Sequence, residues 1–429
     1  MRRRSVDENS VTENSAKQKS VTENSAEQES VAESGIVDSD ATTLVEMNSD
    51  ATTLVDETLA AAADCGASDV HFNPHPDHWE IWFRVDGVLV RRGRHRRDGP
   101  TDPVNRLMAV AGVPVHHAAR PREATLIHAG EAMRLAIFPT VHGIRAVVRR
   151  LENRLRPRTI AALGIPKFES FGDVEDHLAD IAGRADGLVL LIGPSGSGKT
   201  TTLYAMLAEI TRHQASPRSV LAIEDPVESL VPGVNQGGID ASMSLADAMR
   251  AAVRQDADVL SVSEIRDADT AAAVADAAMT GHLTFSSMHA PTVGVALRRW
   301  VQMGVPVHTI AGSMSAIINM RLIRRRDGQG YRGRFPLFEI VDFRPRSGPV
   351  WSVRPNDQAA TTSTAEAMLS ALESGRSATE IDAAGWAAHQ DAADDIEPHR
   401  TLSGAARAAI DAGLTDAPEI RRVLGGVDG

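Results

Sequence analysis

The sequence "GLVLLIGPSGSGKTTTLYAML", residues 187–207, joins an apolar run to a helical pattern through a glycine-rich loop. The loop fits the phosphate-binding pattern, in which two glycines enclose four residues and are followed by Lys and Thr. The glycines let backbone N–H groups converge on phosphate oxygens, and the following helix N-terminus favours negative charge. We expect Lys199 to reach the β- and γ-phosphates and Thr200 to bind Mg²⁺. The residues expected to contact the nucleotide in this loop are Gly193, Pro194, Ser195, Gly196, Ser197, Gly198, Lys199, Thr200 and Thr201.

Short apolar runs on either side of this loop predict a mostly parallel β-sheet. Between residues 187 and 345 they are LVLLI, SVLAI, DVLSVS and LTFSSM, and helical patterns alternate with them. Strands that alternate with helices are typical of a parallel sheet covered by helices on both faces. We therefore expect an α/β fold in which residues 187–345 form a nucleotide-binding domain.

Carboxylates and one histidine stand at the ends of three of these runs. Because the carboxyl ends of parallel strands gather at one sheet edge, we expect Glu224, Asp225 and Glu264 to lie near Lys199. Glu264 would polarise the attacking water, Glu224 would assist, and Asp225 would bind Mg²⁺ through water. The alternative is that such carboxylates cap the next helix, which suits Asp225 and Asp267 better than Glu264. His289 is either a γ-phosphate sensor or the donor of a structural hydrogen bond.

The remaining chain divides into four parts by its sequence pattern. Residues 1–50 form an acidic repeat tail that we expect to be disordered, either a docking arm or a tolerated repeat expansion. Residues 51–152 predict a small α+β domain with a PAS-like arrangement, in which Asp86-Gly87 is a hairpin turn signal. Residues 153–186 are expected to be a linker, and residues 346–429 a helical region.

The composition excludes several classes of protein. The single cysteine, Cys65, rules out an internal disulfide and a zinc site made of several thiolates. No apolar run approaches the ~18 residues of a membrane span, and the basic N-terminus is not followed by the apolar segment of a signal peptide. Residues 1–57 hold 13 acidic and 5 basic residues, a balance of −8 within the total of −12. The rest of the chain is close to neutral, which argues against a dedicated nucleic-acid binder.

These motifs, in this order, resemble the secretion ATPase superfamily, the motors of type II secretion and type IV pilus systems. "IEDPVE" is similar to the family's aspartate box, "QDADVLSVSEIRD" to its Walker B region and "TGHLTFSSMH" to its histidine box. The likeness runs from about residue 54 to residue 425. It implies a RecA-like ATPase domain that takes ATP and Mg²⁺ and pairs with the N-terminal domain. It also implies that Arg134 and Arg149, with Arg84 a weaker match, approach the phosphates.

The resemblance further implies a homo-hexameric ring at the cytoplasmic face of the plasma membrane. Such a ring would power assembly of a pilus or secretion pseudopilus through a polytopic inner-membrane platform protein, and the acidic tail could dock on a further protein. The alternatives are a pilus retraction motor, a nucleotide-gated regulator with little turnover, and a conjugation-type DNA-transfer motor. We expect neither direct nucleic-acid binding nor a transmembrane segment.

The sequence departs from the family pattern at several places. Ser263 replaces the usual glycine before the Walker B glutamate, and Ala290-Pro291 replaces the usual Thr-Asn after His289. Neither change removes a charged catalytic group, so we expect ATP hydrolysis to persist. The segment "NMRLIRRRDGQGYRGR" lacks the four cysteines of the zinc insert found in many assembly motors, so no zinc is expected. The large N-terminal docking domain of secretion motors is also expected to be missing.

Overall fold

The computed structural model describes residues 45–46, 50–97, 102–114, 120–150, 159–168, 173–212, 217–239, 242–343, 355–391 and 401–425. The chain divides into two units between Val45 and Glu46. Most of the acidic repeat tail lies outside the described residues. Within it the structure gives a two-residue strand, β1 (Val45–Glu46), and Asp50, which caps the first described helix.

Helix α2 (Ala51–Asp64) opens the N-terminal α+β domain. The Asp50 carboxylate accepts a hydrogen bond from the Thr53 N–H at 2.8 Å and so satisfies one of the free donors of the first turn. The helical periodicity of the sequence predicts one apolar face, and the structure confirms it. The buried residues of the helix are Leu54, Val55, Thr58, Leu59 and Ala62.

An antiparallel sheet forms the rest of this domain. Its strands follow the spatial order β4-β3-β2-β7-β6-β5. Alternate β3 side chains, Trp79, Ile81 and Phe83, are buried in one core with both helices. Asp86 and Gly87 have φ values of 49° and 84°, which confirms the tight hairpin turn predicted there. The elements are β2 (Asp69–Pro74), β3 (His78–Val85), β4 (Val88–Arg96), α3 (Pro103–Val110), β5 (Arg122–His128), β6 (Glu131–Thr140) and β7 (Gly143–Arg150).

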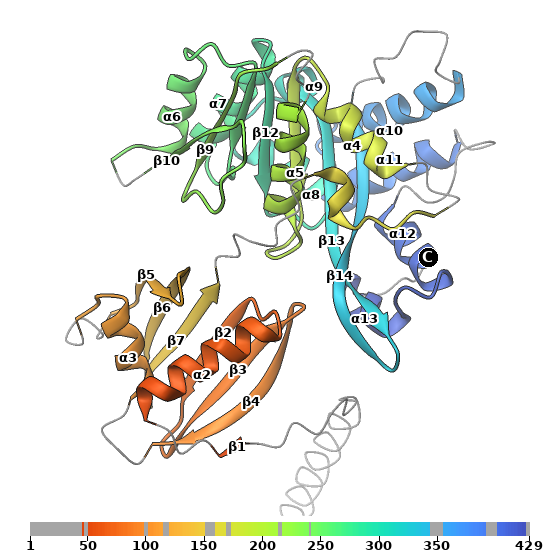
Figure 1. Cartoon of the computed structure of the whole chain (residues 1–429). Helices are drawn as coiled ribbons and strands as arrows, with labels where there is room; N and C mark the ends of the chain where they lie inside the picture. Colours follow the sequence, from red (N-terminus) through yellow and green to blue (C-terminus); the bar gives the residue numbers. More distant parts are fainter. Residues whose placement is uncertain are drawn as a thin grey trace, which may run out of the picture. The chain divides into compact units, whose positions relative to one another are not determined.

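A second sheet carries the glycine-rich loop, and its spatial order is β10-β9-β11-β12-β8-β13-β14 (Figure 1). The strands from β10 to β13 are parallel to their neighbours, as predicted, while β13 and β14 form an antiparallel hairpin at the edge. The strands are β8 (Gly187–Ile192), β9 (Val220–Glu224), β10 (Asn235–Gly238), β11 (Val259–Val262), β12 (Leu283–Met288), β13 (Met314–Asp327) and β14 (Gly330–Asp342).

Helices pack on both faces of this sheet, so β8 is buried along its whole length. Leu188, Leu190 and Ile192 of β8 face one core, whereas Val189 and Leu191 face the other. The helices of the first core are α6 (Leu245–Ala252), α7 (Ala268–Met279), α8 (Val293–Gln302), α9 (Val307–Ser313), α10 (Pro355–Glu373) and α11 (Ala378–Asp391). Those of the second are η2 (Ile160–Leu163), α4 (Val174–Ala182) and α5 (Lys199–Arg212).

The segment expected to be a linker contributes helix α4 to the second core. Leu178 and Ile181 are buried there, because they lie on the same face of an amphipathic helix. After the helix, the Arg184 guanidinium donates to the Ser315 carbonyl oxygen at 3.1 Å and to Asp342 Oδ1 at 2.8 Å. The described part of residues 153–186 is therefore built into the domain of the parallel sheet.

The C-terminal residues form helices, as predicted, and the last two pack on the far end of the β13–β14 hairpin. Helices α12 (Leu402–Asp411) and α13 (Ala417–Leu424) share a core with Ile323 and Phe335. Glu419 of α13 is buried and accepts from the Arg324 guanidinium at 2.7 Å. This ion pair fastens α13 to the hairpin.

The Arg184–Asp342 pair gives a stability prediction. Replacing Arg184 with Leu leaves the carboxylate of Asp342, whose side chain is 2% exposed, without its guanidinium. We expect the substitution to lower the free energy of unfolding by about 3–5 kcal/mol, because the buried carboxylate loses its guanidinium partner. Denaturant unfolding of the full chain measures this. Arg250→Leu, which breaks an exposed pair with Asp247, is the control, and a similar loss in both variants would contradict the prediction.

Candidate functional site

The glycine-rich loop turns sharply between β8 and α5. Gly193, Gly196 and Gly198 have φ values of 147°, 74° and 99°, which side chains rarely permit. A Cβ on Gly193 would lie 2.6 Å from the Ser197 Oγ and 2.7 Å from the Met320 carbonyl oxygen. The loop conformation therefore requires glycine, as the motif predicts.

The Ser197 hydroxyl and the Lys199 ammonium are the polar groups inside this loop. Ser197 Oγ is buried and has no hydrogen-bond partner among the described residues. Lys199 Nζ donates to the carbonyl oxygens of Gly193 at 2.9 Å and Pro194 at 3.0 Å. Burial lowers the pKa of Lys199 to about 8, against the opposing attraction of the Glu264 carboxylate. A curled backbone with an unpaired hydroxyl and a buried ammonium fits a bound phosphate.

Lys199 contacts a second polar side chain, which contacts a third, and the three residues follow the ends of the neighbouring strands β8, β12 and β11. His289 Nδ1 lies 3.3 Å from Lys199 Nζ, and His289 Nε2 lies 3.3 Å from Glu264 Oε1. These contacts fit the tautomer in which Nδ1 accepts from the ammonium and Nε2–H faces the carboxylate. The structure thus brings together Lys199, Glu264 and His289, which the sequence places at one sheet edge.

Backbone hydrogen bonds hold Glu264 from both sides. The Ser263 N–H donates to the Ile223 carbonyl oxygen at 3.0 Å, and the Ile265 N–H donates to that of Ser287 at 2.9 Å. The Ser287 hydroxyl donates to the Ser263 carbonyl oxygen at 2.7 Å. The residue that departs from the family's glycine is therefore an integral part of the support for Glu264.

Glu224 lies at the end of β9, but its carboxylate faces α5 and β10. The Tyr204 hydroxyl donates to Glu224 Oε2, and Gln236 Nε2 donates to Oε1 at 2.7 Å. Glu224 is only 4% exposed, so these donors satisfy a carboxylate that water scarcely reaches. The next residue, Asp225, is exposed and precedes Pro226 through a cis peptide bond. Thr200 lies half-buried in the first turn of α5.

Sequence reasoning missed a buried network on β13, the strand beside β8. Arg321 Nη2 donates to the Pro291 carbonyl oxygen at 2.7 Å, and Nη1 donates to Asn319 Oδ1 at 2.9 Å. Asn319 Nδ2 donates to Glu339 Oε2 at 2.7 Å. Burial raises the pKa of Glu339 to about 7, although the hydrogen bond from Asn319 counteracts it. The sequence does contain a signal for this network, because the apolar run "SAIINMRLI" is interrupted by the polar residues Asn319 and Arg321.

This network also accounts for proline at position 291. Proline lacks an N–H but keeps its carbonyl, and that carbonyl accepts from both Arg321 and Asn319. The substitution therefore preserves the hydrogen bonds by which β13 holds the segment after His289.

Three arginines of the N-terminal domain form a row on the sheet face opposite its core. Arg84 and Arg149 are both cross-strand neighbours of Asp69, and Arg134 is the neighbour of Arg149. Arg149 Nε donates to Asp69 Oδ1 at 2.8 Å, and Arg134 lies 3.7 Å from Glu123. The structure thus aligns the three arginines that the family resemblance singles out.

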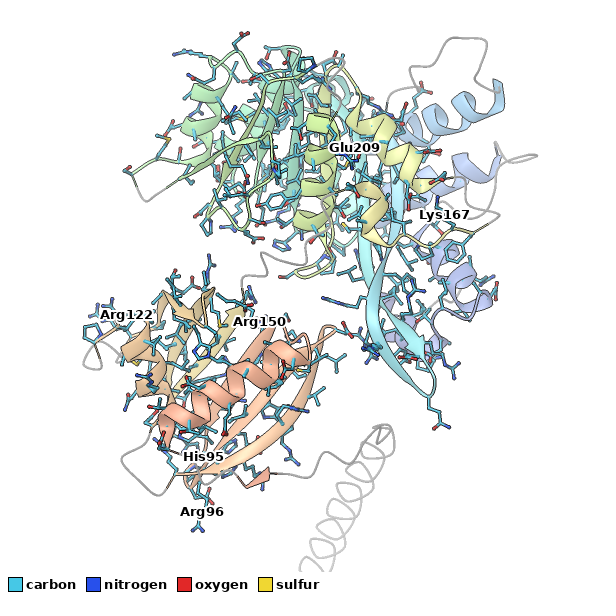
Figure 2. The ribbon with its side chains drawn as sticks, in the orientation of Figure 1. His95, Arg96, Arg122, Arg150, Lys167 and Glu209 are labelled. Atoms are coloured by element: carbon cyan, nitrogen blue, oxygen red, sulfur yellow. The ribbon has the colours of Figure 1, made fainter. Side chains whose placement is uncertain are left out.

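Two other arginines of this domain lie on neighbouring parts of the sheet. Figure 2 shows Arg122 on β5 and Arg150 on β7. Arg150 Nη2 lies 3.0 Å from Glu131 Oε2. Because Arg150 follows Arg149 on the strand, its side chain points to the other face.

A mostly parallel sheet, a glycine-rich loop between β8 and α5, and polar groups at the strand ends are the architecture of the phosphate-loop class of proteins. Residues 46–421 match the family model of the type II/IV secretion system proteins, and the chain belongs to this family.

Among characterised relatives, the chain is 36% identical over 273 residues to the type II secretion system protein HxcR of Pseudomonas aeruginosa, covering 62% of this chain and 56% of HxcR. It is 32% identical over 269 residues to the type IV pilus assembly ATPase PilB of Thermus thermophilus, covering 60% of this chain and 29% of PilB. The chain spans about half the length of the type II secretion relatives it matches.

Solved structures share the fold at lower identity. The Legionella pneumophila ATPase DotB superposes with a TM-score of 0.63 at 18% identity, covering 90% of this chain and 98% of DotB. The pilus retraction motor PilT superposes with a TM-score of 0.53 at 24% identity, covering 79% of this chain and 96% of PilT. The α/β architecture is thus that of known secretion and pilus ATPases.

The hydroxyl that supports Glu224 gives a prediction that uses the only two tyrosines of the chain. Tyr204→Phe deprives a buried carboxylate of a donor, so we expect the free energy of unfolding to fall by about 1–3 kcal/mol. Tyr331→Phe removes a hydrogen bond of 2.6 Å to Asp416, which is only half-buried, so water can replace the donor and the loss should be smaller. Denaturant unfolding compares them, and a larger loss for Tyr331→Phe would contradict the prediction.

Proposed function

We propose that this chain binds ATP with Mg²⁺ at residues 193–201 and hydrolyses it in a RecA-like domain. The observation that carries the proposal is the contact chain Lys199–His289–Glu264, built at the carboxyl edge of β8, β12 and β11. Hydrolysis needs positive charge near the phosphates and a base that orients water. The contacts of Lys199 and Glu264 with the same His289 side chain support these two roles. Family membership supports the same activity.

The loop residues have separate parts in binding. Lys199 would exchange the carbonyl oxygens of Gly193 and Pro194 for phosphate oxygens, while the loop N–H groups and the Ser197 hydroxyl supply further donors. Thr200 would bind Mg²⁺ directly and Asp225 through water. When bound, Mg²⁺ neutralises part of the phosphate charge.

Glu264 is the proposed base, and His289 is the proposed sensor. Glu264 would accept the proton of the attacking water from a position that Ser263 and Ile265 hold through their backbone bonds. His289 touches both Lys199 and Glu264, so any movement of Lys199 toward a phosphate changes the hydrogen bonding of the base. Glu224 would assist from the next strand, held in place by Tyr204.

The N-terminal domain, for which we propose a PAS-like arrangement, would supply further positive charge. Arg134 and Arg149, with Arg84 in the same row, would approach the phosphates when the two domains close around the nucleotide. Guanidinium groups stabilise the charge that spreads over phosphate oxygens in the transition state. Closure and opening would couple hydrolysis to movement.

At the level of the assembly we propose a homo-hexameric motor at the cytoplasmic face of the inner membrane. It would power a type IV pilus or a type II secretion pseudopilus through a polytopic membrane partner, because its relatives carry those names. The acidic tail would dock on a second protein. None of the helices in the described part of the chain combines the length and apolarity needed to cross a bilayer.

Glu264→Gln tests the base directly. The amide cannot accept the proton, so we expect turnover to fall by about 10²-fold or more while nucleotide affinity changes little. Phosphate release and equilibrium binding of ATP are measured on the same preparation. Glu366→Gln, an exposed position on α10, is the matched control. Turnover of Glu264→Gln equal to wild type would exclude this role, and no turnover in wild type would favour the nucleotide-gated regulator.

The pKa of Lys199 predicts a pH dependence of nucleotide binding. With a pKa of about 8 in the free protein, the side chain is charged below that pH and increasingly neutral above it. Bound phosphate favours the charged form, so binding above pH 8 requires proton uptake, and affinity should fall as pH rises toward ~10.

Titrations with a fluorescent ATP analogue across this range measure the effect. The guanidinium of Lys199→Arg stays charged across this range. We therefore expect the affinity of this variant for the nucleotide to be lower than that of wild type but independent of pH. A wild-type affinity that is constant up to pH ~10 would show that Lys199 is already charged throughout.

A further inference from the structure

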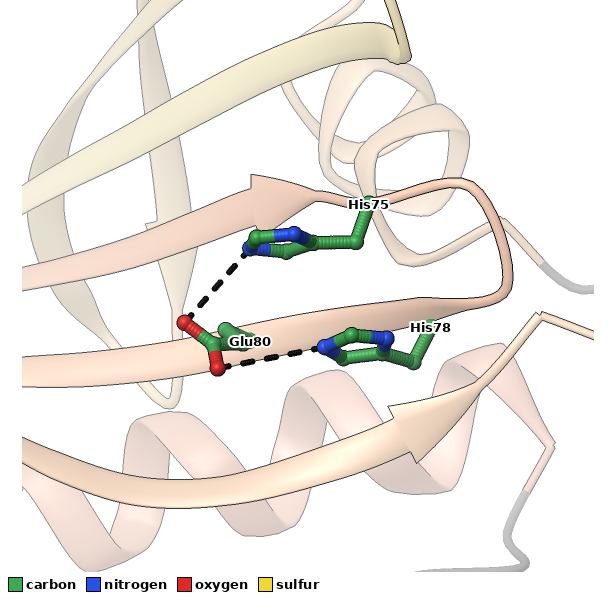
Figure 3. Close-up of side chains that lie close together, drawn as sticks. All are labelled: His75, His78 and Glu80. Carbon is green, nitrogen blue, oxygen red and sulfur yellow. Dashed lines mark ion pairs between the residues drawn. The ribbon is translucent and has the colours of Figure 1, made fainter. Parts of the chain in front are cut away.

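The hairpin between β2 and β3 gathers two histidines and a glutamate that the proposed ATPase does not use. His75 Nε2 lies 3.5 Å from Glu80 Oε2, and His78 Nε2 lies 3.8 Å from Glu80 Oε1 (Figure 3). One potential ligand atom of each residue lies within 4.8 Å of the other two. All three side chains are partly buried.

The local backbone holds these groups on one side of the hairpin. His78 and Glu80 are two residues apart on β3, so their side chains point to the same face. The His75 N–H donates to the His78 carbonyl oxygen at 2.8 Å and closes the turn. The two imidazole rings stack with centroids 4.5 Å apart and an interplanar angle of 6°. As Figure 3 shows, the stacked rings point an Nε2 edge toward each Glu80 oxygen.

Asp77 favours one tautomer of the His78 ring. The Asp77 carboxylate lies 2.8 Å from His78 Nδ1, which places the proton of a neutral ring on Nδ1. His78 Nε2 is buried and has no hydrogen-bond partner among the described residues. Its lone pair then faces a carboxylate oxygen, an arrangement that a cation between them would stabilise. A carboxylate that orients a histidine in this way is the usual outer support of a metal ligand.

The distances suit a small tetrahedral ion. Four ligands at 2.0–2.1 Å from Zn²⁺ stand about 3.4 Å apart. The two histidine Nε2 atoms lie 3.5 Å and 3.8 Å from different oxygens of Glu80, so each imidazole is near that spacing from the carboxylate. Two imidazole nitrogens with one carboxylate oxygen is a zinc ligand set, whereas Mg²⁺ and Ca²⁺ prefer oxygen alone.

Four arginines around the cluster set the competing charges. Arg94 and Arg91 lie 3.3 Å and 3.6 Å from Glu80 Oε1, and Arg96 is the cross-strand neighbour of His78. Arg97 donates to the His75 carbonyl oxygen at 3.1 Å. A cation bound here would compete with Arg91 and Arg94 for the Glu80 carboxylate.

We propose that His75, His78 and Glu80 bind Zn²⁺, with water in the fourth position. The expectation that the chain takes no zinc rested on the missing cysteines of a different segment. This site lies in the N-terminal domain and uses no thiolate, so the absence of that cysteine insert does not bear on it. A bound ion would cross-link the β2–β3 turn through residues from both of its sides.

The test uses the full chain, stripped with chelator and free of nucleotide. It is titrated with Zn²⁺ by calorimetry and with Co²⁺, whose visible absorption reports tetrahedral coordination. We expect one tetrahedral ion per chain. His75→Gln, His78→Gln and Glu80→Gln should each weaken its binding at least ~10-fold. Wild-type affinity should also fall as pH is lowered, because protonated imidazole cannot bind metal.

Controls separate this site from other histidines and from misfolding. His128→Gln removes a histidine of the same domain that pairs with Asp56 on a different element, and its binding should match wild type. Asp77→Asn should weaken binding through His78 alone, and Arg94→Leu should strengthen it by removing one competitor for the Glu80 carboxylate. Melting temperatures identify any variant that does not fold. The Zn²⁺ affinities of the folded variants then test the proposal. Equal affinity for wild type and every folded ligand variant, or the absence of tetrahedral Co²⁺ absorption in wild type, would overturn the proposal.

Discussion

The common direction of β8, β12 and β11 is the constraint on which the rest of the site depends. Because these strands are parallel and adjacent, their carboxyl ends reach the same edge in neighbouring positions. One end becomes the glycine-rich loop, the next presents His289 and the third presents Glu264. This adjacency brings the three side chains within reach of one another, and contacts of 3.3 Å join Lys199 to His289 and His289 to Glu264.

The sequence alone predicts the parts of this arrangement that depend on local pattern. The fully apolar run of β8, the glycine positions of the loop and the buried face of α2 each follow from periodicity or backbone preference, and the structure has them as predicted. The grouping of Lys199, His289 and Glu264 also follows, since parallel strands share an edge.

Local sequence patterns do not predict contacts between segments that are distant along the chain. Glu224 also ends a strand, yet its carboxylate turns toward Tyr204, and strand position alone does not say which way a side chain leaves the edge. The pairing of Arg184 with Asp342 joins positions 158 residues apart, so no local pattern reveals that α4 belongs to the nucleotide-binding core. The triad of His75, His78 and Glu80 is local, but its ligand geometry depends on ring stacking and on Asp77.

Strand β13 connects the two ends of the domain as one continuous element. Its Met320 carbonyl lies against the space that a side chain on Gly193 would fill, and its Arg324, four residues further, is bonded to Glu419 of α13. An extended strand of that length spans about 13 Å and resists stretching, since its neighbour β14 is bonded to it throughout. A displacement of the glycine-rich loop would accordingly be transmitted along β13 to helix α13.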